Sequence, residues 1–427
     1  MTPQSNFMIA APVLPDREYA LRTLLDTMNL RPGVVDPYNP LFPFARFEQL
    51  HVARFVILKD ETLGDLAPED ALPDAPVRLA FLGDCDGEAE PMLAQFVAQA
   101  ADGLRQIFSH CEGFSSDIDL LRWMRRHSLR PAAQYVNWVG RTVRQIREEA
   151  ALRAALRSYI AQHTAAFDGQ SPGKLRNWLI TVHQVNGPTL TPPERTPFAW
   201  YVRYILNRIG VPVVLLLLSP FLLIGAPVFL WILRRRETTD PVITPPPSPA
   251  HLDALSIIED HDVTNQFSAF GSVKPGRFRR WTLVFIFWLL DFSTHQIYTR
   301  GRLARVNTIH FARWVFTDDK RRLFFASNYD GSLDSYMDDF INKVAFGVNL
   351  VFGNGLGFPR TRFLVFGGIK NELPYKRYLR RHQIPTQVWY KAYPGLTAAD
   401  LARNTMLREG LEGRKSDDQA RQWLALI

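Results

Sequence analysis

The 427-residue chain has only two cysteines, Cys85 and Cys111. Two isolated thiols make neither a disulfide framework nor a cysteine zinc site, and they suit a reducing compartment. The sequence also lacks a P-loop, a G-x-S-x-G elbow and an H-E-x-x-H helix, so phosphoryl transfer, serine hydrolysis and zinc chemistry have no motif behind them. Residues 1–14 lack the basic start and apolar core of a cleaved signal peptide, so we expect none.

The formal net charge is +8, and a group of arginines surrounds one apolar segment in the middle of the chain. This placement suits an anionic membrane surface better than a nucleic-acid groove. No base-reading or RNA-binding module accompanies the charge, so we expect no nucleic-acid partner. The arginines are Arg203, Arg208, Arg234, Arg235, Arg236, Arg277, Arg279 and Arg280.

The chain repeats itself. The motif His51–Val56 (HVARFV) returns as His310–Val315 (HFARWV), and Asp86-Gly87 returns as Asp330-Gly331. Further identities keep one register without a gap: Phe96, Gly103, Phe108, Gly113 and Phe114 return as Phe340, Gly347, Phe352, Gly357 and Phe358. So many aligned identities predict two tandem copies, residues 1–141 and 265–427, separated by an insert, 142–264.

Each copy reads as a β-α-β-β-α-β unit. Apolar patterns predict strands at 6–14, 50–58 and 77–83, a helix at 16–29 and a clearer helix after Asp86-Gly87. Closing strands are expected at 134–139 and 387–393. Such a unit is a ferredoxin-like sandwich with one open apolar sheet face, and two copies can cover each other. The predicted fold class is therefore α+β, with an intrachain dimeric α/β-barrel.

The insert holds a charged helical segment, 142–166, and an uncharged run, 209–233, between proline-rich linkers. The run is long enough to span a bilayer, and arginines flank both ends, so membrane insertion is favoured over a buried core helix. A second apolar stripe, suited to lying against lipid, follows in 277–298. The residues expected to contact lipid are Val213, Leu216, Phe221, Leu223, Phe229, Trp231, Trp281, Phe285 and Trp288.

If both copies form one barrel, they lie on the same side of the membrane, so the number of crossings between them is even. Two routes stay open: a second crossing by 277–298, or a re-entrant hairpin turning where Pro212, Pro220, Gly225 and Pro227 interrupt the run. We favour the hairpin, with residues 277–298 docked on the membrane surface. Its basic ends would lie on the cytoplasmic face under the positive-inside rule.

Several stretches of the second copy resemble a family of bacterial membrane-associated proteins with a dimeric α/β-barrel fold, which brings no established reaction. They are Asn265-Gln266, Val273–Gly276, Thr308–Trp314, Ser327–Gly331, Gly357–Arg360 and Pro385–Trp389. The resemblance implies a location at the bacterial inner membrane. More distantly, Gly83–Gly87 is similar to the G-x-x-D-G motif of dye-decolourising peroxidases, whose superfamily also includes the chlorite dismutases. Those proteins hold haem against such a barrel, and the motif's aspartate works on the distal side.

That likeness makes haem the one cofactor to test. His51 and His310 are the candidate axial ligands, because each lies on a strand expected to face the interior. Asp86 and Asp330 are candidate acid–base groups, and Arg313 is a candidate catalytic partner. The alternatives are structural: histidines in a satisfied sheet layer, aspartates capping the following helices, and Arg54 and Arg313 paired with Asp86 or Asp330. Alternation along a strand places each arginine on the opposite face from its histidine.

Two functions follow from these features. The favoured hypothesis is a membrane-anchored module that binds an apolar ligand or partner in or beside the barrel, and the alternative is a haem-dependent peroxidase-like oxidoreductase. A roomy pocket with His51 or His310 projecting into it and an arginine nearby would support the enzyme. An apolar seam without a cavity between the copies would support the binding module.

Overall fold

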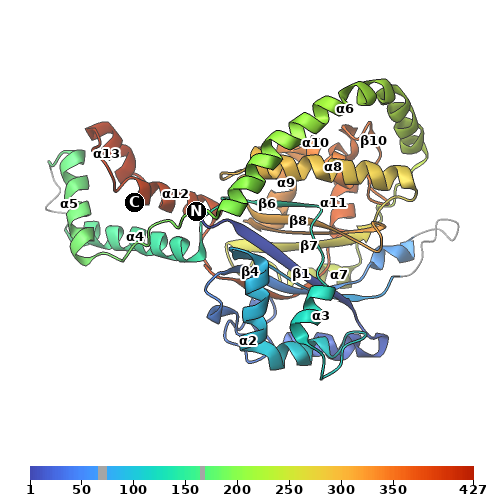
Figure 1. The fold of residues 1–427 in the computed structure, drawn as a ribbon, viewed down its shortest axis with the longest axis horizontal. Helices are drawn as coiled ribbons and strands as arrows, with labels where there is room; N and C mark the ends of the chain where they lie inside the picture. The colour runs from blue at the N-terminus through green and yellow to red at the C-terminus, as the bar shows by residue number, and fades with distance from the viewer. Residues whose placement is uncertain (66–74, 164–168) are drawn as a thin grey trace.

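The computed structural model describes residues 1–65, 75–163 and 169–427, and the chain folds as an α+β protein. Two four-stranded antiparallel sheets lie at the centre, with helices on the outer face of each (Figure 1). The first half supplies β1 (Gln4–Pro12), α1 (Glu18–Asp26), β2 (Asn29–Arg31), β3 (Val34–Val35), β4 (Leu50–Leu58), β5 (Arg78–Asp86), α2 (Ala89–Phe108), α3 (Leu120–Arg126) and β6 (Ala133–Val136). The second half supplies β7 (Thr264–Ser272), α8 (Arg277–Gln296), β8 (Ile309–Thr317), β9 (Arg322–Asp330), α9 (Leu333–Lys343), α10 (Ala345–Phe352), β10 (Thr361–Arg362), β11 (Phe366–Gly367), α11 (Glu372–His382) and β12 (Thr386–Lys391).

The two central sheets exchange their closing strands. The first sheet has the order β1-β5-β4-β12 and the second has the order β6-β8-β9-β7. Each sheet therefore takes three strands from one half of the chain and its fourth from the other. The expectation that each half would complete its own ferredoxin-like sheet is wrong, because alternation predicts a strand but not its partner. No closed barrel forms among the described strands, which corrects the predicted barrel.

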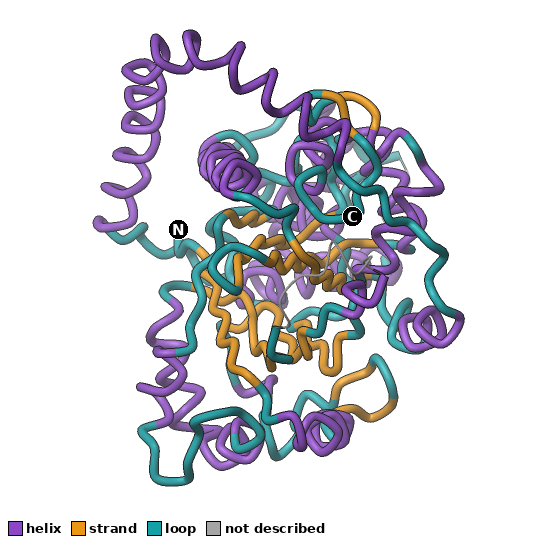
Figure 2. The backbone as a smooth tube through the Cα atoms, turned by 90° about the vertical axis from the view of Figure 1, so that its right-hand side faces the viewer, coloured by secondary structure: helices purple, strands orange, loops and turns teal. Residues whose placement is uncertain are grey.

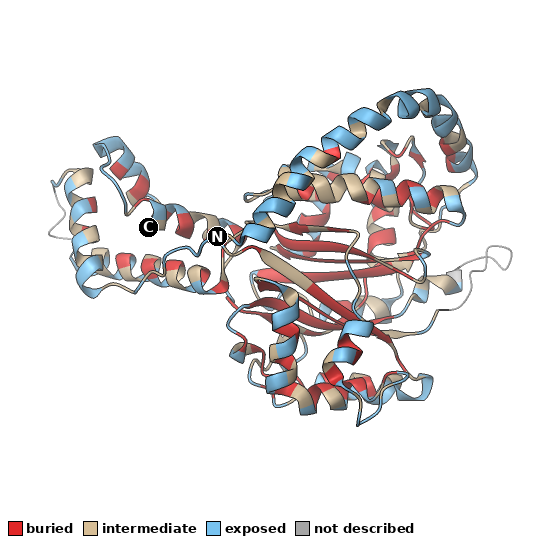
Figure 3. Cartoon of the chain, in the orientation of Figure 1, coloured by how far each residue is buried: buried red, intermediate tan, exposed pale blue. Residues whose placement is uncertain are grey.

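Three apolar layers account for the stability of this arrangement. Residues of the first sheet pack with α1, α2 and α3, and residues of the second sheet pack with α8 to α11. A smaller cluster fills the seam between the sheets, with Met8, Val56 and Leu82 meeting Phe270, Val315 and Phe324. The strands of the two central sheets are mostly buried (Figure 3). Because apolar side chains line both faces of each sheet, each half buries its seam face against the other.

The insert forms two separate features. The helices α4 (Val143–Gln162) and α5 (Pro172–Asn186) pack with the C-terminal helices α12 (Ala398–Glu409) and α13 (Asp417–Leu424). Leu152, Leu179, Leu407 and Trp423 belong to the apolar core of this arm, which extends away from the sheets (Figure 1). After it come α6 (Phe198–Thr239) and the short α7 (Pro249–Ser256).

The helix α6 is a bent arch over α8 (Figures 1 and 2). Gln296, at one end of α8, donates a hydrogen bond to the Tyr204 carbonyl at 3.3 Å, and near the other end the rings of Phe278 and Phe229 lie 5.1 Å apart. From the rise per residue, about 38 Å of α6 thus spans about 27 Å of α8, so the helix has to bow. Pro212, Pro220 and Pro227 lie inside it, and they bend the helix rather than break it as predicted.

The apolar surface of α6 is exposed. It is long and apolar enough to cross a membrane, and none of its most apolar window is buried. Eight of the nine side chains predicted to contact lipid are exposed, including Leu216, Phe221 and Leu223 on α6 and Trp281 on α8. Trp288 is the exception and is half-buried.

Candidate functional site

A bulge places His51 and His310 on the seam side of their strands. The pairing of β4 with β5 is irregular between Leu50 and Val52, and that of β8 with β9 between Ile309 and Phe311. An extra residue reverses the alternation beyond it. Each histidine therefore shares the seam face with its arginine, and the expectation of opposite faces is wrong. The His51 ring lies 5.3 Å from that of Phe311 on the other sheet.

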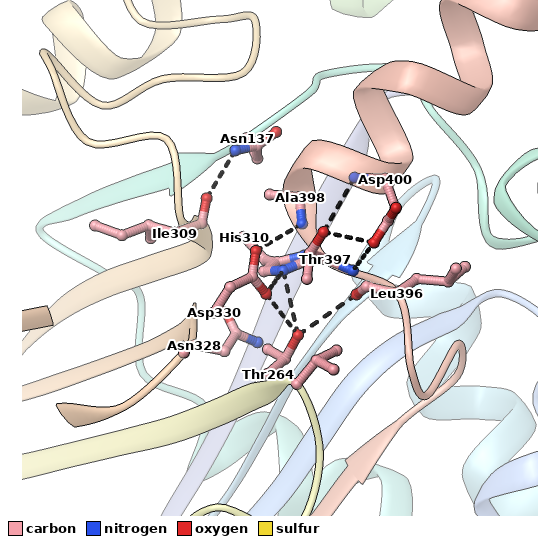
Figure 4. A network of polar contacts seen from close by, with 12 residues as sticks. Asn137, Thr264, Ile309, His310, Asn328, Asp330, Leu396, Thr397, Ala398 and Asp400 are labelled. Carbon is pink, nitrogen blue, oxygen red and sulfur yellow. Dashed lines mark hydrogen bonds and ion pairs between the residues drawn. The ribbon is translucent and has the colours of Figure 1, made fainter. Parts of the chain in front are cut away.

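His310 is held in a closed polar network (Figure 4). Its Nε2 lies 2.6 Å from Oδ1 of Asp330, which also accepts a hydrogen bond from the Thr264 hydroxyl at 2.7 Å. The ammonium of Lys391 donates to the Thr264 oxygen at 2.6 Å. Burial lowers the pKa of His310, and the Asp330 charge only partly opposes this. Burial also acts to raise the pKa of Asp330, but His310 and the surrounding donors outweigh it and lower that pKa.

The first half of the chain has an equivalent histidine–aspartate contact, with different neighbours around it. His51 Nε2 lies 2.9 Å from Oδ1 of Asp86, and its Nδ1 lies 3.2 Å from the Tyr393 hydroxyl. The second carboxylate oxygen of Asp86 accepts the backbone N–H of Val143 at 2.9 Å, and that of Asp330 accepts the N–H of Ala398 at 2.6 Å. Val143 and Ala398 are the first residues of α4 and α12. Both aspartates thus accept the first N–H of a helix far along the chain, beside its N-cap residue, Thr142 for α4 and Thr397 for α12. They do not cap α2 and α9 as predicted, because the N-caps of those helices are Glu88 and Ser332.

The lowered pKa values of His310 and Asp330 predict that the fold loses stability in acid. A histidine whose pKa falls on folding stabilises the fold above its unfolded pKa, near 6.5, and loses that contribution as pH falls. The lowered pKa of Asp330 extends the loss below its unfolded value of 3.8. We expect the unfolding temperature to drop as pH falls from about 7 to 4, and the drop above pH 5 to be smaller in His310→Gln, with its titrating imidazole gone. The control is His261→Gln, an exposed site; equal profiles in wild type and His310→Gln would contradict the assignment.

Arg54 and Arg313 each cross the seam between the sheets. Arg54 donates to the carbonyls of Phe267 at 2.8 Å and Ser327 at 3.0 Å. Arg313 donates to the carbonyls of Phe7 at 2.9 Å and Gly83 at 3.0 Å, and it pairs with Asp84. Neither arginine pairs with Asp86 or Asp330, which corrects that expectation. Burial, and then the charge of Arg313, lower the pKa of Arg54 to about 9.

Haem does not fit between the sheets. The described residues enclose two small cavities at the seam, about 10 Å³ beside Arg54 and Arg313 and about 20 Å³ beside His51 and His310. Such volumes admit about one or two waters. Both Nε2 atoms already face carboxylates. The seam thus lacks the roomy pocket on which the peroxidase hypothesis depends.

The large cavity lies elsewhere, on the outer face of the second sheet. It has a volume of about 1040 Å³. The C-terminal half of α6, the helices α8, α9 and α10, and the outer face of the sheet surround it. Its volume is at the upper end of the usual range for small-molecule sites, about 300–1,000 Å³. Its lining is almost wholly apolar, with Phe229, Phe278 and Trp281 near one end and Leu290 and Tyr298 near the other. This cavity was not predicted from the sequence.

A loop explains why only one half has this cavity. In the first half, the segment between α1 and β4 folds Phe42, Phe44 and Phe47 into the core, where Phe42 packs 5.2 Å from Phe81 and 5.0 Å from Phe96. Its backbone approaches α2 so closely that a Cβ on Gly103 would lie 1.9 Å from the Leu41 carbonyl oxygen. A Cβ on the aligned Gly347 would meet no atom of another segment within 4 Å.

The segment between α8 and β8, residues 297–308, is the shorter counterpart, and it lines the cavity instead of filling it. The sequence carried one signal of this difference: the first copy has the longer segment with three phenylalanines, whereas the glycine is present in both copies.

No protein-family model, curated protein or solved structure matches this chain. The class of protein therefore rests on the fold and this cavity: an α+β protein with an exposed apolar helix arched over an apolar pocket.

Proposed function

We propose that this protein is a membrane-anchored binding module that takes an apolar, chain-shaped lipid into the cavity beneath α6. The single observation that carries the proposal is the cavity itself, about 1040 Å³ and apolar, opening beside a helix whose surface is exposed and apolar. A ligand that enters it leaves water for an apolar site along its whole length. The family resemblance adds to the proposal a location at the inner membrane of a bacterium.

The arch of α6 supports attachment to one leaflet. With two equal straight arms, about 38 Å of helix over a base of about 27 Å rises at most about 13 Å. That is about half of a hydrocarbon core of about 30 Å. Both feet of the arch contact the same folded body, so this geometry favours the re-entrant anchor over two crossings.

Basic residues and a buried carboxylate at one foot of the arch support an orientation for it in the membrane. At its C-terminal foot, the buried carboxylate of Glu237 accepts hydrogen bonds from the backbone N–H groups of Phe363 and Leu364, each at 2.8 Å. Arg235, Arg236 and Arg277 are exposed beside this foot. Basic residues at the feet suit the anionic lipid of a cytoplasmic face, and we assign the domains to that side.

Tandem duplication is the proposed origin of the fold. Four pairs of equivalent contacts support it. Two are His51–Asp86 with His310–Asp330, and Asp86–Val143 with Asp330–Ala398. The other two are the hydrogen bonds from Arg54 to the carbonyls of Phe267 and Ser327, which match those from Arg313 to the carbonyls of Phe7 and Gly83. The glycines after the aspartates adopt positive φ in both halves, +77° at Gly87 and +85° at Gly331. In this proposal one copy kept the filled core, and the other lost the filling segment and became the binding half.

Cross-linking from a lipid bilayer tests the function. We would place the protein in vesicles that contain a palmitic acid with a mid-chain diazirine, irradiate, and map the labelled peptides. Labelling of the cavity floor at Ala312 and Trp314, in addition to α6, is expected. Gly347→Phe fills the open space and should reduce floor labelling at least about fivefold while α6 stays labelled. The matched control is Gly225→Phe on α6, which also faces open space but does not line the cavity. Wild-type labelling confined to α6 would refute the proposal.

A further inference from the structure

We infer that the lipid in this cavity is anionic, with a carboxylate or phosphate head held at Arg236 and Arg277 and its chain directed inward along α8. This inference rests on the proposed function, since it concerns the same cavity, and it adds the class of head to the chain. It is carried by two arginines without acidic partners at the mouth of the cavity and by the length of the apolar path behind them.

Arg277 lies at the mouth of the cavity. It lines the cavity and is exposed, and so is Trp281, one turn further along α8. The guanidinium of Arg236, from the end of α6, lies beside this turn. Its Cζ is 5.4 Å from the centre of the Phe278 ring, which also lines the cavity, and its Nη1 would lie 3.2 Å from a Cβ on Gly276. The two arginines therefore flank the opening where the C-terminal foot of α6 meets the start of α8.

The carboxylates near this mouth already have partners. Asp240 pairs with Lys274 at 3.0 Å and with Arg279, and Glu237 accepts the two backbone N–H groups described above. In the part of the chain that the structure describes, neither arginine of the mouth forms an ion pair or a hydrogen bond through its guanidinium. The complement of two such guanidiniums is a carboxylate or phosphate group, whose oxygens accept from both.

The other cation of the lining has a partner within the protein. Among the described residues that line the cavity, only Arg277 and Lys343 are charged. The ammonium of Lys343 lies 2.6 Å from the Asp339 carboxylate. Lys274 donates to the Gly353 carbonyl at 2.8 Å, so the C-terminal end of α10 lies near the start of α8. Lys343 precedes the other end of α10, roughly 12 Å away, so the mouth at Arg277 is the end of the cavity that can hold an anion.

The apolar path behind the mouth is long enough for an acyl chain. The lining follows α8 from Arg277 to Leu290, which is about 20 Å of helix. Lipid chains fill a hydrocarbon core of about 30 Å from both sides, so one chain extends about 15 Å. A head at Arg277 therefore leaves the whole chain against the apolar lining.

Exposed tryptophans suit a mouth at the level of the lipid headgroups. Trp231 and Trp281 are 62% and 64% exposed. A cation lies against each ring: Arg235 Cζ is 5.7 Å from the centre of the first, and Lys320 Nζ is 6.0 Å from the centre of the second. Indoles and basic side chains collect at the boundary of a bilayer. A lipid that enters here keeps its head at that boundary while its chain passes from the leaflet into the cavity.

Competition between lipids with one chain and different heads tests the inference. The probe is hexadecanol with a mid-chain diazirine in phosphatidylcholine vesicles, and the measurement is labelling of the cavity floor at Ala312 and Trp314. Hexadecyl phosphate, hexadecanol and hexadecyltrimethylammonium compete with the probe. In wild type, the phosphate should displace it at a concentration about tenfold below that of the alcohol, as for two exposed ion pairs, and the ammonium lipid should be the weakest competitor.

Variants locate the head. Arg277→Met should reduce the advantage of the phosphate about threefold, and Arg236→Met with Arg277→Met should remove it, while displacement by hexadecanol changes less than about twofold. The double reversal Arg236→Glu with Arg277→Glu should make the ammonium lipid a better competitor than the phosphate. The matched control is Lys343→Met, which removes the other lining cation and should change none of these results.

Each outcome decides a different claim. If the phosphate and the alcohol displace the probe equally in wild type, or if Lys343→Met removes the difference and Arg277→Met does not, the inference is overturned and the lipid-binding function stands. If neither this probe nor the palmitic acid probe labels the floor, both fall. The comparison of heads in wild type needs no variant, so it decides the inference even where a substitution disturbs folding.

Discussion

Replacing Leu216, Phe221 and Leu223 with aspartate is expected to move the protein from the membrane fraction to the soluble fraction. These three side chains lie in the central part of α6 and are 73–74% exposed. A carboxylate at membrane depth costs about 3 kcal/mol, so three together outweigh the attachment that a single shallow arch supplies. The measurement is fractionation of cells or vesicles by ultracentrifugation, followed by detection of the full-length chain in pellet and supernatant.

A control triple tests whether any added charge has this effect. Tyr19, Leu30 and Tyr38 are equally exposed apolar residues, at 83%, 70% and 71%, on the first-sheet side of the molecule. Their aspartate variants should stay with the membrane. Should the α6 triple remain in the pellet, resist washing at high salt and keep its fold by circular dichroism, α6 would not be the anchor.

The second large effect is expected at the seam, where Arg313→Met should destabilise the fold by about 3–5 kcal/mol. The substitution keeps the aliphatic bulk but removes the donors to Phe7 and Gly83 and the charge that faces Asp84. Burial already raises the pKa of Asp84, although Arg313 opposes the shift. Without Arg313, this carboxylate must take up a proton or remain buried without a charged partner. Thermal unfolding in detergent, followed by tryptophan fluorescence, measures the loss.

The other half of the chain supplies the matched comparison. At the position equivalent to Asp84 stands Asn328, whose side-chain oxygen accepts the Phe311 N–H at 2.8 Å. Arg54, the counterpart of Arg313, accordingly has carbonyl and hydroxyl partners and pairs with no carboxylate in the described part of the chain. Arg54→Met should therefore cost less than Arg313→Met. The double variant Asp84→Asn with Arg313→Met should be more stable than Arg313→Met alone, and a purely additive result would show that the ion pair is not the source of the loss.

The two halves thus share the contacts that hold the sheets together and differ in the cavity. The seam arginines and the buried His–Asp pairs occur in both halves, as expected of groups that hold the sheets together. Among the described residues, the large cavity lies in the second half, where the proposed ligand would bind. Of the predicted catalytic residues, Asp86, Asp330 and Arg313 all have structural partners that account for their burial, and His51 and His310 face carboxylates rather than an open cavity.

The sequence by itself determined the elements and their kinds. Apolar periodicity located β4 at Leu50–Leu58, as the structure has it, and predicted the helix after Asp86-Gly87, because these patterns depend only on neighbours in the chain. The uncharged run also identified α6, although the helix continues through its prolines. Internal identities pair His51 with His310 and Gly103 with Gly347 in the sequence alone.

Only the tertiary structure decided which partners these elements take. The exchange of β6 and β12 between the sheets, the hydrogen bonds from the first residues of α4 and α12 to Asp86 and Asp330, and the strand bulges all join residues far apart in the chain, and local patterns carry no record of such pairings. The cavity depends on the absence of a filling segment above Gly347. Empty space is a property of packing, which is why the sequence did not reveal this cavity.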